Sequence, residues 1–440
     1  MIAASLFAAG VLPMEFVEWT DNPDIMQYPL VSYWATATGF IVYCFILLFW
    51  QRGHRIFLDT LCVKQDDTTW KALALLSMPA LLKSSDSLLV LWDPTYTRRL
   101  WCCFEIAAFL HSRPIGQKAS VRVRPTLLGV GFISILMALA IVLLVLVFVP
   151  GDPDKGRTGN QAVMWPLMAG CSFVAFYFSV MQLRKFFRSV EMIQSELQDF
   201  RFDNCSCHCC ATNHQFSQTC DRRILTICIS KWFGSIDRFE DLMRSEVLAC
   251  LTEQLATNIL TYREFVVMSV PVLWHFLDTA SEPLDWYLRS GHTHKPVLRQ
   301  EMRSFAREVC RGLGWAFGAL PILFLVISRL ACLLRRRIGR SYGAKMCWDL
   351  LIICSILLVA IALFVAFLVL EQVCGISLLG ILVFDAILFT CTFLLFRCLP
   401  DPMRLKAQAV DQRDAHGTDT SPSLEEMEVA ASAVRNRIQL

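Results

Sequence analysis

The sequence predicts a mainly α-helical multi-pass membrane protein with a small parallel α/β insert. Its 440 residues are 55% apolar and 18% charged, whereas soluble proteins have roughly 45–50% apolar and about 25% charged residues. Six apolar runs have the length of about 20 residues that crosses a bilayer. Between the first two runs, short apolar segments alternate with a helix-length segment, as in the β-α-β units of parallel sheets.

The six apolar runs are the predicted membrane spans. They are residues 28–50, 127–149, 163–183, 312–334, 350–370 and 375–396. A weaker run, 262–280, contains Pro271 and has charges near both ends, so we expect a buried or re-entrant helix there. The distribution of Lys and Arg leaves six and seven spans both open, because either number places one basic segment outside the cytosol.

The charges between the spans predict which loops are cytosolic. Residues 1–27 contain four acidic and no basic residues, so they are expected outside, and the first span leads residues 51–126 into the cytosol. Residues 127–183 then form a transmembrane hairpin, residues 184–311 a second cytosolic region, and residues 312–396 three further spans. The net charge of +3 gives no reason to expect a nucleic-acid partner. The expected partner is the lipid bilayer.

Residues 51–126 are predicted to form a small parallel α/β module. Three segments are predicted as its strands: 55–59, 87–92 and 119–125. The segment 68–83 has the length of a crossover helix, which we expect to break at Pro79. A second helix covers residues 98–110. Helical spacing predicts that its core face consists of Leu100, Cys103, Phe104 and Ala107.

Carboxylates mark the expected edge of this sheet. Asp59 ends the first predicted strand, Asp93 ends the second, and Glu105 lies on the helix that follows. Ligands of parallel sheets bind beyond the carboxyl ends of the strands, so these three carboxylates are expected around one cleft. The alternative for Glu105 is a position at the margin of the core, where it reaches water.

The same residues resemble the middle of a TIR domain. The resemblance is carried by "FLD…CVKQDD" and "S…LLVLW…Y…RLWCCFE", and "FLDTLCVKQDD" is also similar to the opening motif of fungal heterokaryon-incompatibility domains. The resemblance implies that Glu105 is the carboxylate that cleaves nicotinamide from NAD in enzymatic TIR domains, with Trp101 as the motif tryptophan. It covers only part of a TIR domain, beginning at the second strand.

NAD is therefore one candidate substrate of the module. The candidate cofactor-binding residues are Asp59, Asp93, Arg98, Arg99 and Trp101. The two arginines would hold the pyrophosphate, and Glu105 would stabilise the positive charge that develops on the ribose. The alternative is that Glu105 pairs with Arg98 or Arg99 and that the module docks through homotypic TIR-like contacts. This alternative is favoured, because the segment contains no glycine-rich phosphate loop.

A wider resemblance covers most of the chain. The segment "CDRRILTICISKWFGSIDRFE" at 220–240, together with the insert, is similar to multi-pass membrane proteins of single-celled algae that carry a truncated TIR-like domain. That family brings no established activity. The resemblance therefore implies an architecture and leaves the function open.

Residues 184–260 are predicted as two amphipathic helices around a cysteine-rich loop. The loop "CSCHCCATNHQFSQTC" contains six candidate zinc ligands: Cys205, Cys207, Cys209, Cys210, His214 and Cys220. Thiolates and imidazoles at this density suit tetrahedral zinc in a reducing compartment. Lipidation of cysteines near a membrane and plain reduced thiols are the alternatives, because the spacing differs from that of a zinc finger.

The predicted spans contain two charged residues of note, Arg329 and Asp385, which could pair and hold two helices together. Transporters usually carry polar groups near mid-membrane, so transport is one alternative function. Gly312, Gly314 and Gly318 are expected at close helix contacts.

Residues 397–440 are predicted as a polar tail. Within it, residues 423–438 combine a capping box, Ser423 and Glu426, with heptad spacing. Such a short helix needs a helical partner.

The function expected from these features is signalling or assembly through the TIR-like module of an integral multi-pass membrane protein. An NAD glycohydrolase that uses Glu105 is the first alternative. A transporter or channel is the second.

Overall fold

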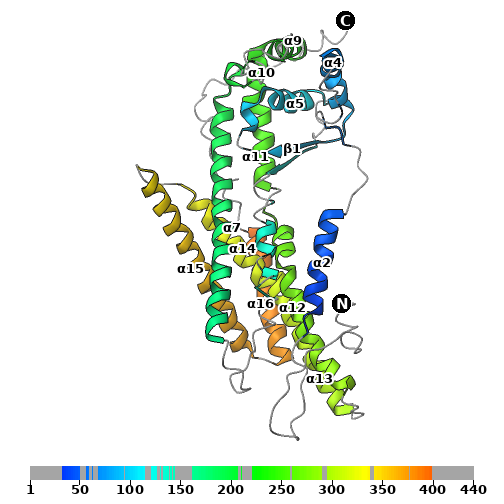
Figure 1. Cartoon of the computed structure of the whole chain (residues 1–440), viewed down its shortest axis with the longest axis vertical. Helices are drawn as coiled ribbons and strands as arrows, with labels where there is room; N and C mark the ends of the chain where they lie inside the picture. The colour runs from blue at the N-terminus through cyan, green and yellow to red at the C-terminus, as the bar shows by residue number, and fades with distance from the viewer. Residues whose placement is uncertain are drawn as a thin grey trace, which may run out of the picture. The chain divides into compact units, whose positions relative to one another are not determined.

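The structure, a computed structural model, is mostly helical and contains a small parallel sheet (Figure 1). It describes residues 32–49, 56–58, 62, 68–93, 95–113, 120–125, 129, 132–137, 139–140, 142–143, 161–206, 210, 221–257, 260–289, 295–336, 341–375 and 377–398. The predicted outer segment 1–27 and the predicted heptad helix 423–438 lie outside these residues. The predicted span 127–149 is described only in part, at helical positions between Gly129 and Leu143.

The described helices are α2 (Trp34–Phe49), α4 (Thr68–Ser84), α5 (Leu100–His111), α7 (Gln161–Gln198), α9 (Asp221–Phe233), α10 (Ile236–Leu242), α11 (Leu248–Thr257), α12 (Tyr262–Arg289), α13 (Lys295–Gly314), α14 (Leu320–Leu333), α15 (Tyr342–Cys374) and α16 (Leu378–Cys398). Short 3-10 turns are η1 (Tyr96–Arg98) and η3 (Phe202–Asn204), and π-helical turns are η4 (Met243–Val247) and η5 (Trp315–Ala319). The described strands are β1 (Leu88–Trp92) and β2 (Val121–Pro125).

The insert contains two of the three predicted strands. β1 and β2 pair in parallel, with Val90 opposite Val123. The predicted strand at 55–59 is wrong at its described residues, because residues 56–58 belong to no strand and their side chains are exposed. An apolar run predicts burial, but it does not by itself supply a neighbouring strand. Asp59 lies outside the described residues.

The predicted break at Pro79 is also wrong. α4 continues through Pro79 to Ser84. Proline removes one backbone hydrogen bond from a helix. The contacts of α4 with α5 compensate for the lost hydrogen bond and keep the helix continuous.

The core of the insert is the predicted face of α5. Leu100, Cys103, Phe104 and Ala107 are all buried, as expected. The ring of Phe104 lies 6.4 Å, centroid to centroid, from that of Trp232 on α9. α9, η4 and α11 contact α5 or β2, so helices from the second predicted region cover the insert.

α7 is one helix of 38 residues. The predicted end of a span at residue 183 stays a prediction, and the helix continues through this position without a break. No glycine or proline interrupts the sequence after Gly170, and apolar residues at helical spacing, such as Val190 and Leu197, stay buried. α7 contacts α14 and α15, and it also contacts η1 and α11 (Figure 1).

The helices from α12 onward form a bundle, in which α12 packs on α13, α2 and α14. Among the described residues, three helical segments are long and apolar enough to cross a membrane: Arg299–Leu333, Tyr342–Cys374 and Leu378–Cys398. These correspond to the last three predicted spans. α12 runs unbroken through the predicted re-entrant segment 262–280, while α2, from the first predicted span, is a shorter apolar helix.

Candidate functional sites

The carboxyl end of β1 leads into a turn closed by an ion pair between Asp93 and Arg99. Oδ2 of Asp93 lies 2.7 Å from Nη2 of Arg99, and Oδ1 accepts a hydrogen bond of 2.7 Å from the backbone N–H of Thr95. Burial raises the pKa of Asp93, but the hydrogen bonds from Thr95 and the charge of Arg99 outweigh it and hold this pKa below its usual value. Two predicted cofactor-binding residues thus bind each other.

Arg98 and Thr97, in the same turn, bind Glu196 of α7. Nε of Arg98 donates to Oε1 at 3.1 Å, and the Thr97 hydroxyl donates to Oε2 at 2.9 Å. The backbone of the turn also pairs with Ser206, beyond the end of α7. Arg98 and Arg99 thus bind Glu196 and Asp93, and the pairing of either arginine with Glu105 stays a prediction.

A cleft of about 480 Å³ opens where this turn meets α7. Its lining includes Arg98, Glu196, Arg201 and Cys205. The cleft therefore carries two guanidinium groups, one of them already bound to a carboxylate. Among the described residues predicted to hold NAD, only Arg98 lines it.

Glu105 is half-buried at the margin of the core face of α5. Trp101, one turn earlier, is half-buried as well, and its ring stands edge-on to Phe104 with centroids 6.1 Å apart. Neither Glu105 nor Trp101 lines the cleft described above. The position of Glu105 corresponds to the margin of a core, the alternative that the sequence left open.

Cys205 is buried beside Cys103 of α5. The sulfur atoms of Cys103 and Cys205 lie 3.0 Å and 3.9 Å from the carbonyl oxygen of Thr97. A hydrogen bond between the two thiols raises the pKa of Cys103, and burial adds to this rise. The same hydrogen bond lowers the pKa of Cys205, where burial opposes the fall and Arg222 supports it. Cys205 is thus part of the packing between α5 and the segment after α7.

Cys205 is one of the six predicted zinc ligands, and its thiol lies in this buried packing. Cys210 is half-buried, and the other predicted ligands, Cys207, Cys209, His214 and Cys220, lie outside the described residues. Within the described ranges, no three His, Cys, Asp or Glu side chains are grouped so that they could hold a metal ion. The zinc site stays a prediction.

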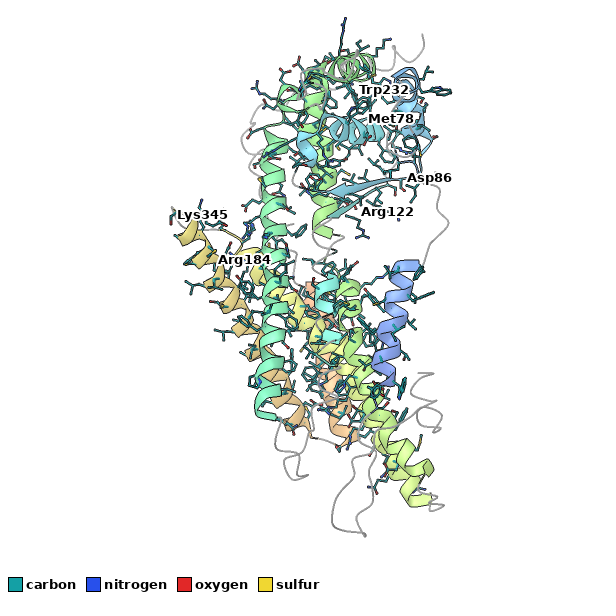
Figure 2. All side chains as sticks on the ribbon, viewed as in Figure 1. Met78, Asp86, Arg122, Arg184, Trp232 and Lys345 are labelled. Atoms are coloured by element: carbon teal, nitrogen blue, oxygen red, sulfur yellow. The ribbon has the colours of Figure 1, made fainter. Side chains whose placement is uncertain are left out.

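One face of the two-stranded sheet is exposed. Val90 points into the core, whereas the side chains of Leu89 and Leu91 are 53% and 57% exposed. In register with these leucines lie Arg122 and Arg124, which are also exposed; Figure 2 labels Arg122 on β2. We call these four residues the leucine–arginine face. Parallel sheets normally have both faces covered, so an uncovered face is unusual.

A second group of polar side chains lies between α13, α15 and α16, where the carboxylates are buried and Arg311 is half-buried. We call it the buried polar cluster, and its members are Glu308, Arg311, Trp315, Glu371 and Asp385. Nη2 of Arg311 lies 3.4 Å from Oε2 of Glu371, and Nη1 lies 3.5 Å from Oε2 of Glu308. The indole N–H of Trp315 donates to Oε2 of Glu371 at 3.3 Å.

Asp385 does not pair with Arg329 as predicted. Its Oδ1 atom is buried and has no hydrogen-bond partner in the described part of the chain. A Cβ atom on Gly314 would clash with this oxygen, so α13 and α16 touch here. Gly312 and Gly318 lie at similarly close contacts, as predicted.

Sequence reasoning missed Glu308, Arg311 and Glu371. They lie at the ends of the predicted spans, where charged residues are ordinary. The spacing of Glu308 and Arg311 was an available signal, because residues three apart share one face of a helix. The position of Glu371 gave no such signal.

Comparison with known proteins adds no identification: no family model, no curated protein and no solved structure matches this chain.

Proposed function

We propose that the protein is a membrane-anchored signalling or assembly protein whose insert module, TIR-like by its sequence, binds a second copy of the chain. The observation that carries the proposal is the exposed leucine–arginine face. Exposed apolar side chains in a contiguous patch are typical of interaction surfaces, and a parallel sheet is normally covered on both faces.

Charge complementarity supports a second copy as the occupant. Two leucine–arginine faces would repel each other, because each carries arginine side chains. The chain has exposed carboxylates elsewhere: Asp237 and Asp241 lie four residues apart on α10, and Asp241 also binds Arg244 at 3.2 Å. A contact between the leucine–arginine face of one copy and these carboxylates of the next would be head-to-tail. Such contacts extend into larger assemblies.

NAD cleavage is less well supported by the contacts of the insert. Arg98 is bound to Glu196 and Arg99 to Asp93, so a pyrophosphate would have to displace a carboxylate from either arginine. These ion pairs instead hold the turn against α7. We infer that the turn transmits movement between the module and α7, a property that suits a signalling protein.

A charge-swap experiment tests the assembly function. Two differently tagged full-length chains are co-expressed, and their co-purification from detergent-solubilised membranes is measured. Arg122→Glu in both copies, or Asp237→Lys with Asp241→Lys in both copies, should reduce co-purification at least several-fold. Combining one Arg122→Glu copy with one doubly substituted copy should restore it, because opposite charges then face each other again.

The matched control is Arg223→Glu, which reverses an exposed arginine on α9 outside the proposed contact. It should leave co-purification unchanged. Wild-type chains that do not co-purify, or an Arg122→Glu chain that pairs as well as wild type, would contradict the proposed function. If Arg223→Glu also reduces co-purification, the two copies associate through their overall charge and not through this contact.

Transport is the second candidate function, and one observation favours it. The buried polar cluster places carboxylates and an arginine among apolar helices, the kind of group that marks proton and ion paths in membrane proteins.

A further inference from the structure

The buried polar cluster contains one carboxylate that its arginines do not neutralise. Arg311 binds both Glu371 and Glu308, and Nε of Arg307 lies 3.0 Å from Oε1 of Glu308. Asp385 has no ion pair in the described part of the chain, and only 6% of its surface is exposed.

The surroundings of Asp385 are apolar on most sides. Its carboxylate lies against the backbone of Gly314, and the next residue toward the N-terminus, Phe384, is completely buried. The titratable groups that interact with Asp385 from neighbouring helices are Glu371 on α15 and Cys310 on α13. Neither is a cation, so neither can neutralise the carboxylate.

One further titratable group of the neighbouring helices interacts with Arg311. His275 of α12 interacts with Arg311 and with Glu308, and the guanidinium of Arg311 also lies 5.3 Å from the ring centre of Phe276. Arg311 is thus held by two carboxylates and an aromatic ring, and it would have to leave them to reach Asp385.

An ionised carboxylate without a partner is too costly to keep in an apolar interior, so such a group takes up a positive charge or becomes neutral. A hard metal ion would need several oxygen ligands, and the described residues offer no group of three metal-binding side chains. A proton needs only one acceptor oxygen, which Oδ1 of Asp385 provides.

We propose that Asp385 is a proton-binding site of the helix bundle. The carboxyl group holds the proton while α13 and α16 are in contact at Gly314, because the uncharged form can lie against this backbone. When the O–H bond breaks, the proton passes to water and the carboxylate needs solvation, so the contact at Gly314 must open. The inference goes beyond the proposed assembly function and does not depend on it.

A helical irregularity at the same place supports this inference. The π-helical turn η5 begins at Trp315, immediately after Gly314. π-helical turns inside α-helices are rare and occur frequently at functional sites. Here the turn places the indole of Trp315 on Glu371, beside the helix contact that Asp385 makes.

Infrared difference spectroscopy of the full-length protein in detergent, titrated in D₂O, tests the inference. We expect the carbonyl band of one protonated carboxyl group per chain, which is lost as pH rises. Carboxyl-¹³C labelling of aspartate should shift the band, and Asp385→Asn should abolish it. The asparagine side chain has the same shape without the charge, so this variant should fold. Should it fail to fold, the isotope shift still identifies the band as an aspartate.

The matched control is Asp349→Asn on α15, since Asp349 is also buried but is paired with Arg184. This variant should keep the band. A wild-type protein without such a band, a band that persists in Asp385→Asn, or a band insensitive to aspartate labelling would overturn the inference. A band that disappears on addition of Na⁺ at constant pH would also overturn it, in favour of a metal-cation site.

The unfolding temperature provides a second readout. If Asp385 binds a proton more tightly in the folded chain than in the unfolded chain, stability falls as pH rises. The unfolding temperature of wild type should therefore fall with rising pH more steeply than that of Asp385→Asn. Equal slopes would contradict proton binding at this site.

Discussion

Arg184 of α7 and Asp349 of α15 form a buried ion pair, with Nη1 of the arginine 2.7 Å from Oδ1 of the aspartate. The same guanidinium donates through Nη2 to the carbonyl oxygen of Leu334, at the end of α14, at 2.8 Å. Arg184, labelled in Figure 2, thus joins three helices through one side chain. The arrangement fixes α7 against α14 and α15.

Arg184→Met should destabilise the protein strongly. It removes the closest ion-pair contact of the buried Asp349 and leaves Arg188 3.4 Å away. Removing one partner of a buried pair costs about 3–5 kcal/mol, and Arg188 should keep the loss near the lower value. Lys185→Met, at the neighbouring exposed position, is the control and should change stability little. Denaturant unfolding of the purified chains measures both, and equal midpoints would contradict the role of the pair.

Phe104→Ala should lower the stability of the protein far more than Glu105→Ala, although the two residues are neighbours. Phe104 is buried, so its truncation should cost about 3–5 kcal/mol. Glu105 is half-buried at the margin, and alanine is the better helix former, so its replacement should cost about 1 kcal/mol or less. Denaturant unfolding of the two variants measures the difference.

Glu105→Ala also separates docking from catalysis. If the insert only docks, wild-type protein clustered on liposomes consumes no NAD, and Glu105→Ala behaves like wild type. NAD turnover by wild type that disappears in Glu105→Ala would contradict the docking function. We expect no turnover, because Arg98 and Arg99 are bound to carboxylates of the chain.

The elements that the sequence predicted well are those with a strong local pattern. β1 was predicted from a short continuous apolar run that contains Val90, and β2 from an alternating run that contains Val123. The core face of α5 was predicted because its members recur at helical spacing. Residues 56–58 show the limit of such reasoning, since an apolar run does not reveal whether a second strand lies beside it.

The candidate sites depend on contacts that no local pattern reveals. Arg311 and Glu371 are 60 residues apart in the sequence, and nothing in either segment indicates that they meet. Asp385 stood out because a charge inside an apolar run is rare, yet its neighbour could not be predicted. The sequence offered Arg329 as the partner, whereas the fold brings Gly314 there instead.

Acid should weaken the turn after β1 through Asp93. Because its pKa lies below the usual value, the stability that Asp93 contributes is present above the ordinary aspartate pKa of about 3.9. It is lost as pH falls through the lowered pKa. Hydrogen exchange at the β1 amides should therefore rise more steeply with acid in wild type than in Asp93→Asn. The effect should be at most about 1 kcal/mol, because the ion pair is partly exposed.

Asp86, an exposed carboxylate just before β1 (Figure 2), provides the control for this experiment. Asp86→Asn should show the acid response of wild type. If Asp93→Asn and Asp86→Asn respond alike, the ion pair with Arg99 makes no contribution to the stability of the turn.

Zinc binding should depend on the loop cysteines and not on Cys205. The loop still offers five candidate ligands without Cys205, and four suffice for tetrahedral zinc: Cys207, Cys209, Cys210, His214 and Cys220. Cys205 lies instead against Cys103 and the carbonyl oxygen of Thr97. We expect the full-length protein, purified under reducing conditions, to contain one zinc ion per chain by elemental analysis.

Two substitutions make this prediction specific. Cys205→Ala should keep the zinc and lower the unfolding temperature, because it removes a buried side chain from the contact with α5. Cys207→Ala together with Cys209→Ala should release the zinc, since only three ligands then remain. Loss of zinc from Cys205→Ala would show that the loop can withdraw Cys205 from its buried position. Absence of stoichiometric zinc from wild type would leave the loop with reduced or lipidated thiols, the alternatives that its irregular spacing favours.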